Sequence, residues 1–159
     1  MKVAIIGCGT IANAAHIPAY MKNPEAEIKY FCDIIPERAE KAVETYGCGT
    51  AITDYHVALN DSEIEAVSVC TPNNMHPVIA IDALRAGKNV LCEKPAARTY
   101  AEALEMQKVQ HETGKVLNIG VVNRFNDSVN MIKQFIDEGK LGEVFHVYVS
   151  FRAHRSIPG

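Results

Sequence analysis

The hydrophobic pattern of the chain alternates between short apolar runs and longer segments in which apolar and charged residues are mixed. Runs such as residues 3–6 are continuous, which is typical of parallel strands buried on both faces. The segments between the runs carry helix signals, such as Pro36 at a helix start and Gly47 at its end. We predict strands at 3–6, 27–33, 49–52, 65–70, 89–92 and 116–121, with helices at 10–21, 36–46, 55–59, 77–86 and 100–113.

Strands that alternate with helices of this length predict an α/β fold, a doubly wound parallel sheet with right-handed crossovers. The pattern changes after about residue 122. A helix is predicted at 127–138, a glycine turn at 139–142, and a β-prone strand at 144–151 that would begin a new sheet. No partner for that strand remains before residue 159, so we expect the chain to be incomplete.

A glycine turn follows the first strand directly. Gly7 and Gly9, with Ala12 in third place, match the pattern G-x-G-x-x-G/A, in which the second glycine lets a pyrophosphate approach the backbone. Asp33 ends the second strand, where a carboxylate would accept hydrogen bonds from the adenosine ribose and repel a 2′-phosphate. This is the arrangement of a Rossmann fold that binds NAD, with NADP less favoured. Asp33 could instead cap the turn before Pro36.

Composition narrows the class of partner. The 159 residues are 48% hydrophobic and 22% charged, as in a globular domain, and the net charge of −3 gives no electrostatic case for nucleic acid or a membrane surface. The N-terminus lacks a signal-peptide layout and no apolar run approaches membrane-spanning length, so we expect a cytoplasmic protein. The five cysteines lack C-x-x-C spacing and are expected to be reduced and packed, and no metal-ligand spacing or nucleophile elbow is present.

Two loops at the carboxyl ends of predicted strands carry polar residues. One runs through Thr71–Pro72–Asn73 to His76, and the other is Glu93–Lys94–Pro95. Ligands gather at such ends in open α/β sheets. In the first helix Pro18 should interrupt the helical hydrogen bonds, and His16 beside it could face a ligand or serve as a local hydrogen-bonding group.

These segments together resemble the family named after glucose-fructose oxidoreductase, inositol dehydrogenase and the rhizopine-catabolism protein MocA. The resemblance rests on residues 7–12, 16–18, 71–76, 93–95 and 140–142, and it covers about the first half of a typical member. It implies an NAD(P)-binding Rossmann domain at 1–122 and, at 123–159, the beginning of a C-terminal substrate and oligomerisation domain whose remainder is absent. The family's Asp and His pair in that second domain has no counterpart here.

The resemblance also implies roles for individual residues. Lys94 would orient the substrate and assist proton transfer, unless it is an exposed lysine paired with Glu93. Thr71, Pro72 and Asn73 would line the nicotinamide side, with His76 just behind them unless it caps the helix that follows. Glu93 would contact the nicotinamide ribose. Arg124 would contact substrate or pair with an acid at the domain junction. The predicted cofactor-binding set is Gly7, Gly9, Thr10, Ile11, Asp33, Arg38, Thr71, Pro72, Asn73, His76, Glu93, Lys94 and Asn123.

The function expected is that of an NAD-dependent oxidoreductase that interconverts a hydroxyl and a carbonyl on a sugar, an inositol or a related polyol. Its partners would be that small molecule and, through the absent domain, further copies of itself. A non-catalytic NAD(H)-binding module or truncated regulatory protein is the alternative. A methyltransferase would also use a glycine loop, but that reading does not explain Glu93–Lys94–Pro95.

Overall fold

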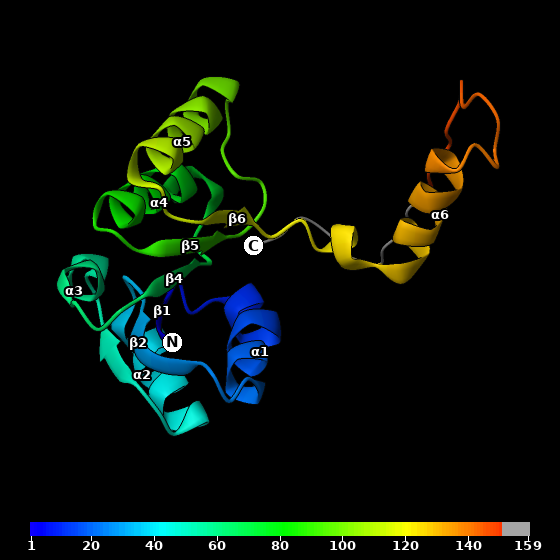
Figure 1. The fold of residues 1–159 in the computed structure, drawn as a ribbon. Helices are drawn as coiled ribbons and strands as arrows, with labels where there is room; N and C mark the ends of the chain where they lie inside the picture. Colours follow the sequence, from blue (N-terminus) through cyan, green and yellow to red (C-terminus); the bar gives the residue numbers. More distant parts are fainter. Residues whose placement is uncertain (151–159) are drawn as a thin grey trace. The chain divides into compact units, whose positions relative to one another are not determined.

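The computed structural model describes residues 1–150, and contacts divide the chain into Met1–Val121 and a second unit that starts at Val122 (Figure 1). The first unit is built on a six-stranded sheet in which all paired strands are parallel. The strand order is β3-β2-β1-β4-β5-β6, so the predicted doubly wound fold is confirmed. The strands are β1 (Lys2–Ile6), β2 (Glu27–Cys32), β3 (Thr50–Ile52), β4 (Ala66–Val69), β5 (Asn89–Cys92) and β6 (Leu117–Ile119).

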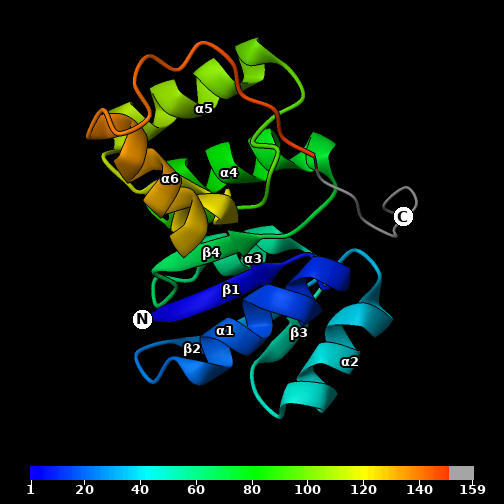
Figure 2. The same cartoon turned by 90° about the vertical axis from the view of Figure 1, so that its right-hand side faces the viewer.

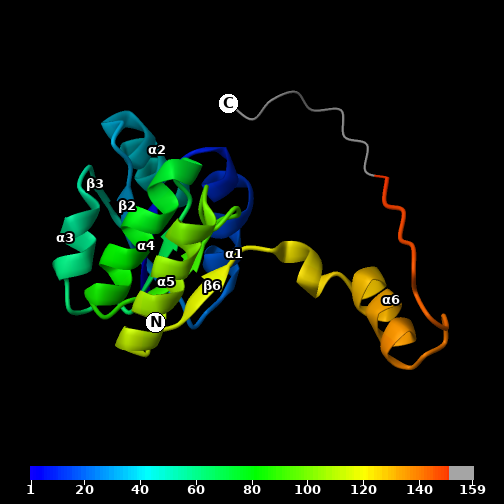
Figure 3. The same cartoon turned by 90° about the horizontal axis from the view of Figure 1, so that it is seen from above.

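Helices cover both faces of this sheet. Figure 2 shows the sheet between two helix layers, and Figure 3 looks onto the face covered by α4 and α5. The helices are η1 (Ala12–His16, a π-helix), α1 (Ile17–Lys22), α2 (Pro36–Tyr46), α3 (Tyr55–Asn60), η2 (Asn73–Met75), α4 (His76–Arg85) and α5 (Tyr100–Thr113). Successive residues of β1 point to opposite faces, so Ala4 and Ile6 pack with α3, α4 and α5, while Val3 and Ile5 pack with η1, α1 and α2.

Local signals account for most helix ends. Thr99 and Glu102 form a reciprocal capping box at the start of α5, and Gly114 ends it in a left-handed conformation. Pro18 lies in the first turn of α1, directly after the π-helix. Because proline has no N–H to donate, the helical ladder is interrupted here as predicted, and the chain passes through a π-turn instead of stopping.

The second unit contains the 3-10 helix η3 (Val122–Phe125) and α6 (Asp127–Asp137), whose first turn is capped by the Asn126 side chain. The predicted turn at 139–142 is present, with left-handed glycines at both ends. The predicted strand at 144–151 is wrong for residues 144–150, which have no regular secondary structure; residue 151 lies outside the described part. A β-prone segment forms a strand only where a neighbouring strand can hydrogen-bond to it, and none of the described residues provides such a strand there.

No helix in residues 1–150 combines the length and apolar character needed to cross a membrane.

Candidate functional site

The site forms where the order of the sheet reverses, at the carboxyl ends of β1 and β4. The register aligns the strand ends, because Ile6 pairs with both Cys32 and Val69, and Val69 pairs with Cys92. The residue after each strand except the edge strand β3 continues the ladder by donating its backbone N–H to the neighbouring strand. These residues are Gly7 (2.7 Å to Cys32 O), Asp33 (3.2 Å to Ile52 O), Cys70 (2.7 Å to Ile6 O), Glu93 (2.9 Å to Val69 O) and Gly120 (2.8 Å to Cys92 O).

The two glycines of the turn have different surroundings. Gly7 has a φ of +94°, and a Cβ placed on it would lie 2.7 Å from the carbonyl carbon and oxygen of Cys70. At Gly9 a Cβ would meet no atom of the described residues within 4 Å. The fold itself therefore requires glycine at position 7, whereas at position 9 the backbone borders open space of the kind a pyrophosphate would use.

The side chain of Asn13 holds the glycine turn through hydrogen bonds. Its side-chain amide donates to the carbonyl oxygens of Cys8 (2.9 Å) and Gly9 (2.8 Å). Thr10 and Ile11, at the start of the helix, are exposed beside it. We did not predict the role of Asn13; its one signal in the sequence is an amide directly after the third small residue of the pattern.

Asp33 is buried, with 7% of its surface exposed. One carboxylate oxygen accepts from the Cys8 N–H (2.9 Å) and the other from the Ile35 N–H (2.9 Å). The turn-capping role considered from the sequence is therefore real, and the carboxylate also holds the glycine turn. A carboxylate accepts about four hydrogen bonds, so capacity for ribose hydroxyls remains. Arg38 is exposed in the first turn of α2.

The loop after β4 contains an unsatisfied group. Thr71 Oγ1 is the one buried side-chain nitrogen or oxygen in residues 1–150 that has no hydrogen-bond partner. Pro72 and Asn73 follow it, and both are exposed at the start of η2. A buried polar atom is usually paired, so an orphaned hydroxyl beside the strand ends is the kind of atom that a ligand satisfies.

His76 is 1% exposed and bridges the two loops. Its Nδ1 lies 2.7 Å from the carbonyl oxygen of Pro95 and its Nε2 lies 2.8 Å from that of Thr71. The predicted alternative, a helix-capping histidine, is wrong, because α4 has no side-chain cap and the ring points to the loops. A role toward cofactor would therefore act through the loop backbone.

Glu93 is also buried, and its partner is His16. Oε1 of Glu93 lies 2.9 Å from His16 Nε2, and Oε2 accepts the backbone N–H of Lys94 (3.1 Å). The side chain of Lys94 is exposed. The carboxylate is thus occupied by His16 and the backbone, so the predicted Glu93–Lys94 side-chain pair is not formed. His16 is the local hydrogen-bonding group that we had weighed against a ligand contact.

His16 completes a chain with Ser68, whose Oγ lies 2.7 Å from His16 Nδ1. Serine, histidine and carboxylate in a row resemble a nucleophilic triad. Ser68, however, has no exposed surface, so no acyl substrate could reach it.

The remaining predictions concern two residues of the second unit, the cysteines and metal binding. Asn123 and Arg124 belong to η3 in the second unit, and their roles stay predictions. The thiols of Cys8, Cys32, Cys70 and Cys92 are free and buried, and burial raises the pKa of each to about 12, as expected for packed, unreactive cysteines. Within the described residues no group of three or more His, Cys, Asp or Glu could hold a metal ion.

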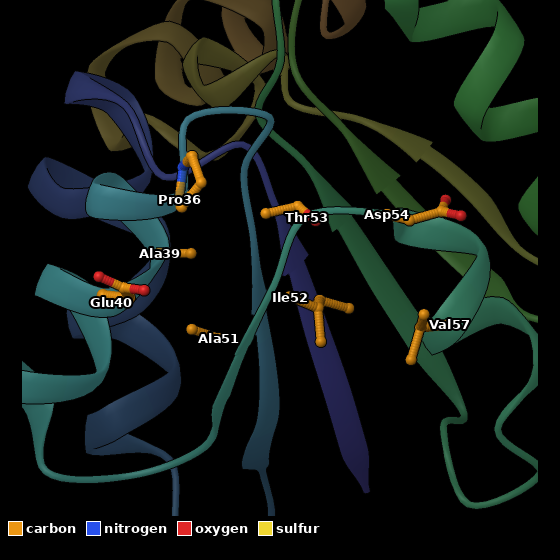
Figure 4. A pocket seen from close by; sticks show the side chains of 8 residues that line it. All are labelled: Pro36, Ala39, Glu40, Ala51, Ile52, Thr53, Asp54 and Val57. Carbon is orange, nitrogen blue, oxygen red and sulfur yellow. The ribbon is translucent and has the colours of Figure 1, made fainter.

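A groove of about 300 Å³ lies elsewhere, over the edge strand β3 between α2 and α3 (Figure 4). Its lining includes Ala39, Ile52 and Val57. Asp54 also lines the groove, but its carboxylate caps α3 by accepting the His56 N–H. None of the predicted site residues lines it.

A doubly wound parallel sheet with a glycine turn at its reversal point defines a Rossmann-type α/β protein. The model of the GFO/IDH/MocA family, described as an oxidoreductase family with an NAD-binding Rossmann fold, matches residues 1–121, and the chain belongs to that family. This confirms the resemblance inferred from the motifs.

Relatives with assigned activities are similar to this chain over less than half of their length. D-glucoside 3-dehydrogenase of Escherichia coli K12 is 32% identical, in a match that covers 100% of this chain and 45% of that protein. Inositol 2-dehydrogenase of Salmonella typhimurium is 31% identical over 93% of this chain and 45% of that protein.

Solved structures of oxidoreductases are also similar to this chain over part of their length. A mutant of KijD10, a 3-ketoreductase from Actinomadura kijaniata in complex with TDP-benzene and NADP, superposes with a TM-score of 0.82 at 30% identity, over 91% of this chain and 44% of that one. WlbA dehydrogenase from Bordetella pertussis, in complex with NADH and UDP-GlcNAcA, gives 0.83 at 29% identity, over 89% and 41%. One neighbour thus holds NADP and the other NADH.

Proposed function

We propose that this chain binds a nicotinamide dinucleotide, NAD in preference to NADP, as the cofactor part of an oxidoreductase. The reaction is interconversion of a hydroxyl and a carbonyl on a sugar, an inositol or a related polyol. The named activities of the relatives support this class of substrate. Residues 123–159 begin the domain that contacts substrate and joins copies of the protein.

The observation that carries the proposal is the contrast between the two glycines at the reversal point of the sheet. Gly7 is required by the packing of the chain, whereas none of residues 1–150 occupies the space over Gly9. The N-terminal end of a helix follows directly, and the free amides and dipole of a helix N-terminus favour an anion such as a pyrophosphate. Thr71 Oγ1, buried and without a partner, supplies a second polar group for the same ligand.

When bound, the nicotinamide supplies the acceptor or donor of hydride. The chain's own residues then do three things. The glycine turn would hold the pyrophosphate, Asp33 would accept hydrogen bonds from the adenosine ribose, and the loops after β4 and β5 would contact the nicotinamide end. Lys94 follows β5 on that side, and its Nζ would take or return the proton of the substrate hydroxyl as hydride moves.

Selection of NAD depends on the charge of Asp33. A carboxylate already fixed by two backbone amides is poised to accept from ribose hydroxyls, and it repels a 2′-phosphate at the same place. Arg38, exposed on α2, is the nearest candidate in sequence to favour a phosphate instead.

The test is a fluorescence titration of the chain with NADH and with NADPH, for the wild type and for Asp33→Asn. We expect saturable binding with NADH preferred, and a change of about tenfold or more in the NADH/NADPH affinity ratio when the charge is removed. The matched control is Asp127→Asn, at the start of α6. Absence of binding to either nucleotide would refute the proposed function, and a ratio unchanged by Asp33→Asn would refute the role of Asp33.

A further inference from the structure

His16 and Glu93 come from segments 77 residues apart and meet beneath the site. His16 is the last residue of the π-helix that follows the glycine turn, and Glu93 is the first residue after β5. Both are 8% exposed. Insertion of a π-turn rotates the residues of a helix, and such turns occur frequently at functional sites.

We propose that His16 and Glu93 form a positioning pair that fixes the Lys94 loop relative to the glycine-turn helix. The inference rests on the proposed function. It goes beyond it by assigning roles to two residues that do not themselves touch substrate: His16 holds the Glu93 carboxylate, and that carboxylate holds the Lys94 backbone.

Both ring nitrogens of His16 and both carboxylate oxygens of Glu93 lie within hydrogen-bond distance of a partner. A carboxylate can only accept, so His16 Nε2 donates to Glu93, while Nδ1 lies within hydrogen-bond distance of the Ser68 hydroxyl, which can donate or accept. The second oxygen of Glu93 accepts the Lys94 N–H, which sets the plane of the peptide that joins the two residues. Every polar atom of the pair is therefore engaged.

Gly120, the residue after β6, lies close to the Glu93 carboxylate. A Cβ added to Gly120 would lie 3.2 Å from Glu93 Oε1, so the chain packs closely against this oxygen. If the His16 donor were lost, a buried carboxylate oxygen would lack its partner and would have to move toward water. Because the same carboxylate holds the Lys94 amide, the lysine loop would move with it.

This displacement would be confined to one end of the cofactor site. The glycine turn and Asp33 are tied to each other by the Cys8 amide and do not depend on Glu93. The loops after β4 and β5 serve the nicotinamide end in the proposed function. Loss of the pair should therefore weaken binding of NADH, while binding of ADP-ribose, which lacks nicotinamide, should be retained.

Two substitutions at His16 distinguish loss of the hydrogen bond to Glu93 from a change in side-chain volume. The amide of His16→Gln reaches the position of Nε2 and can still donate to Glu93, whereas the shorter amide of His16→Asn reaches only the position of Nδ1, toward Ser68. His111→Asn, at an exposed histidine of α5, is the matched control. Affinities for NADH and ADP-ribose are measured by calorimetry on the full 159-residue chain, with circular dichroism to verify folding.

We expect His16→Asn to weaken NADH binding about tenfold while ADP-ribose affinity stays within about twofold. His16→Gln should retain most of the wild-type affinity for NADH. Should His16→Asn not fold, Glu93→Gln carries the same test, because its amide cannot accept from both His16 and Lys94. Equal losses for the two ligands, or no loss for either, would overturn the positioning role. Failure of the wild type to bind NADH at all would instead refute the proposed function.

Discussion

Alanine at Gly7 should destabilise the fold, whereas alanine at Gly9 should not. The two residues belong to one turn and would be equivalent in a simple motif search. Gly7 has a φ of +94°, and its added Cβ would lie 2.7 Å from the carbonyl carbon and oxygen of Cys70 and 2.9 Å from Thr71 N. The atoms in the way are backbone, so no side-chain rotation can relieve the overlap.

The magnitude follows from two contributions. Holding a non-glycine residue at this φ costs about 1–3 kcal/mol. To restore ordinary contact, the exit of β4 must also move away from β1, where the Cys70 N–H donates to Ile6 O at 2.7 Å. Loss of that buried hydrogen bond costs about 1–3 kcal/mol more. The sum of about 2–6 kcal/mol is a large part of the roughly 5–15 kcal/mol that stabilises a typical domain.

Urea unfolding followed by circular dichroism measures this loss. We expect the free energy of unfolding of Gly7→Ala to fall by about 2–6 kcal/mol, or the variant not to fold. Gly9→Ala should unfold within about 0.5 kcal/mol of the wild type but bind NADH at least about tenfold more weakly, because the new methyl occupies the space proposed for the pyrophosphate. Equal stability of the two variants would refute the reasoning from packing, and unchanged NADH affinity in Gly9→Ala would refute the pyrophosphate assignment.

Two further predictions concern a charged cluster and the lysine. Hydrogen bonding to Lys29, then to the Glu63 amide and Tyr30, lowers the pKa of Asp61 from 3.8 to about 2. A carboxyl whose pKa is lower in the folded chain stabilises the fold above about pH 4 and loses that effect as the pH falls toward 2. The free energy of unfolding in urea should therefore decline between about pH 5 and 2, and Asp61→Asn should make that decline shallower. Parallel pH curves for the wild type and the variant would contradict this. Lys94→Ala should abolish turnover by the complete enzyme while leaving NADH affinity of this chain within about threefold, because its proposed role is proton transfer; a retained rate in a steady-state assay would exclude that role.

Much of the fold was predictable because its signals are local. The helices at 36–46 and 100–113 and the strand at 89–92 have the predicted bounds, since proline, a capping box and left-handed glycines mark their ends. The strand at 144–151 was predicted from the same kind of local propensity and is absent from 144–150. A strand is stabilised by its neighbours, and propensity alone does not supply them.

The candidate site divides in the same way. The glycine turn, Asp33 and the loops at 71–76 and 93–95 were predicted, because each directly follows an apolar run that the sequence identifies as a strand. The sequence could not assign the partners of the buried polar groups. Glu93 was expected to face the cofactor or Lys94, and the structure gives it His16; His76 was expected at the cofactor or as a cap, and it bridges two loop carbonyls.

The sequence by itself determined the class of fold, the family and the segments that form the site. Only the tertiary structure decided which residues of those segments meet. The pairs His16–Glu93 and Cys8–Asp33 depend on strand order and register, which bring residues 77 and 25 positions apart to one edge of the sheet. Periodicity and turn chemistry act over a few residues, whereas contacts at such separations exist only once the sheet has assembled.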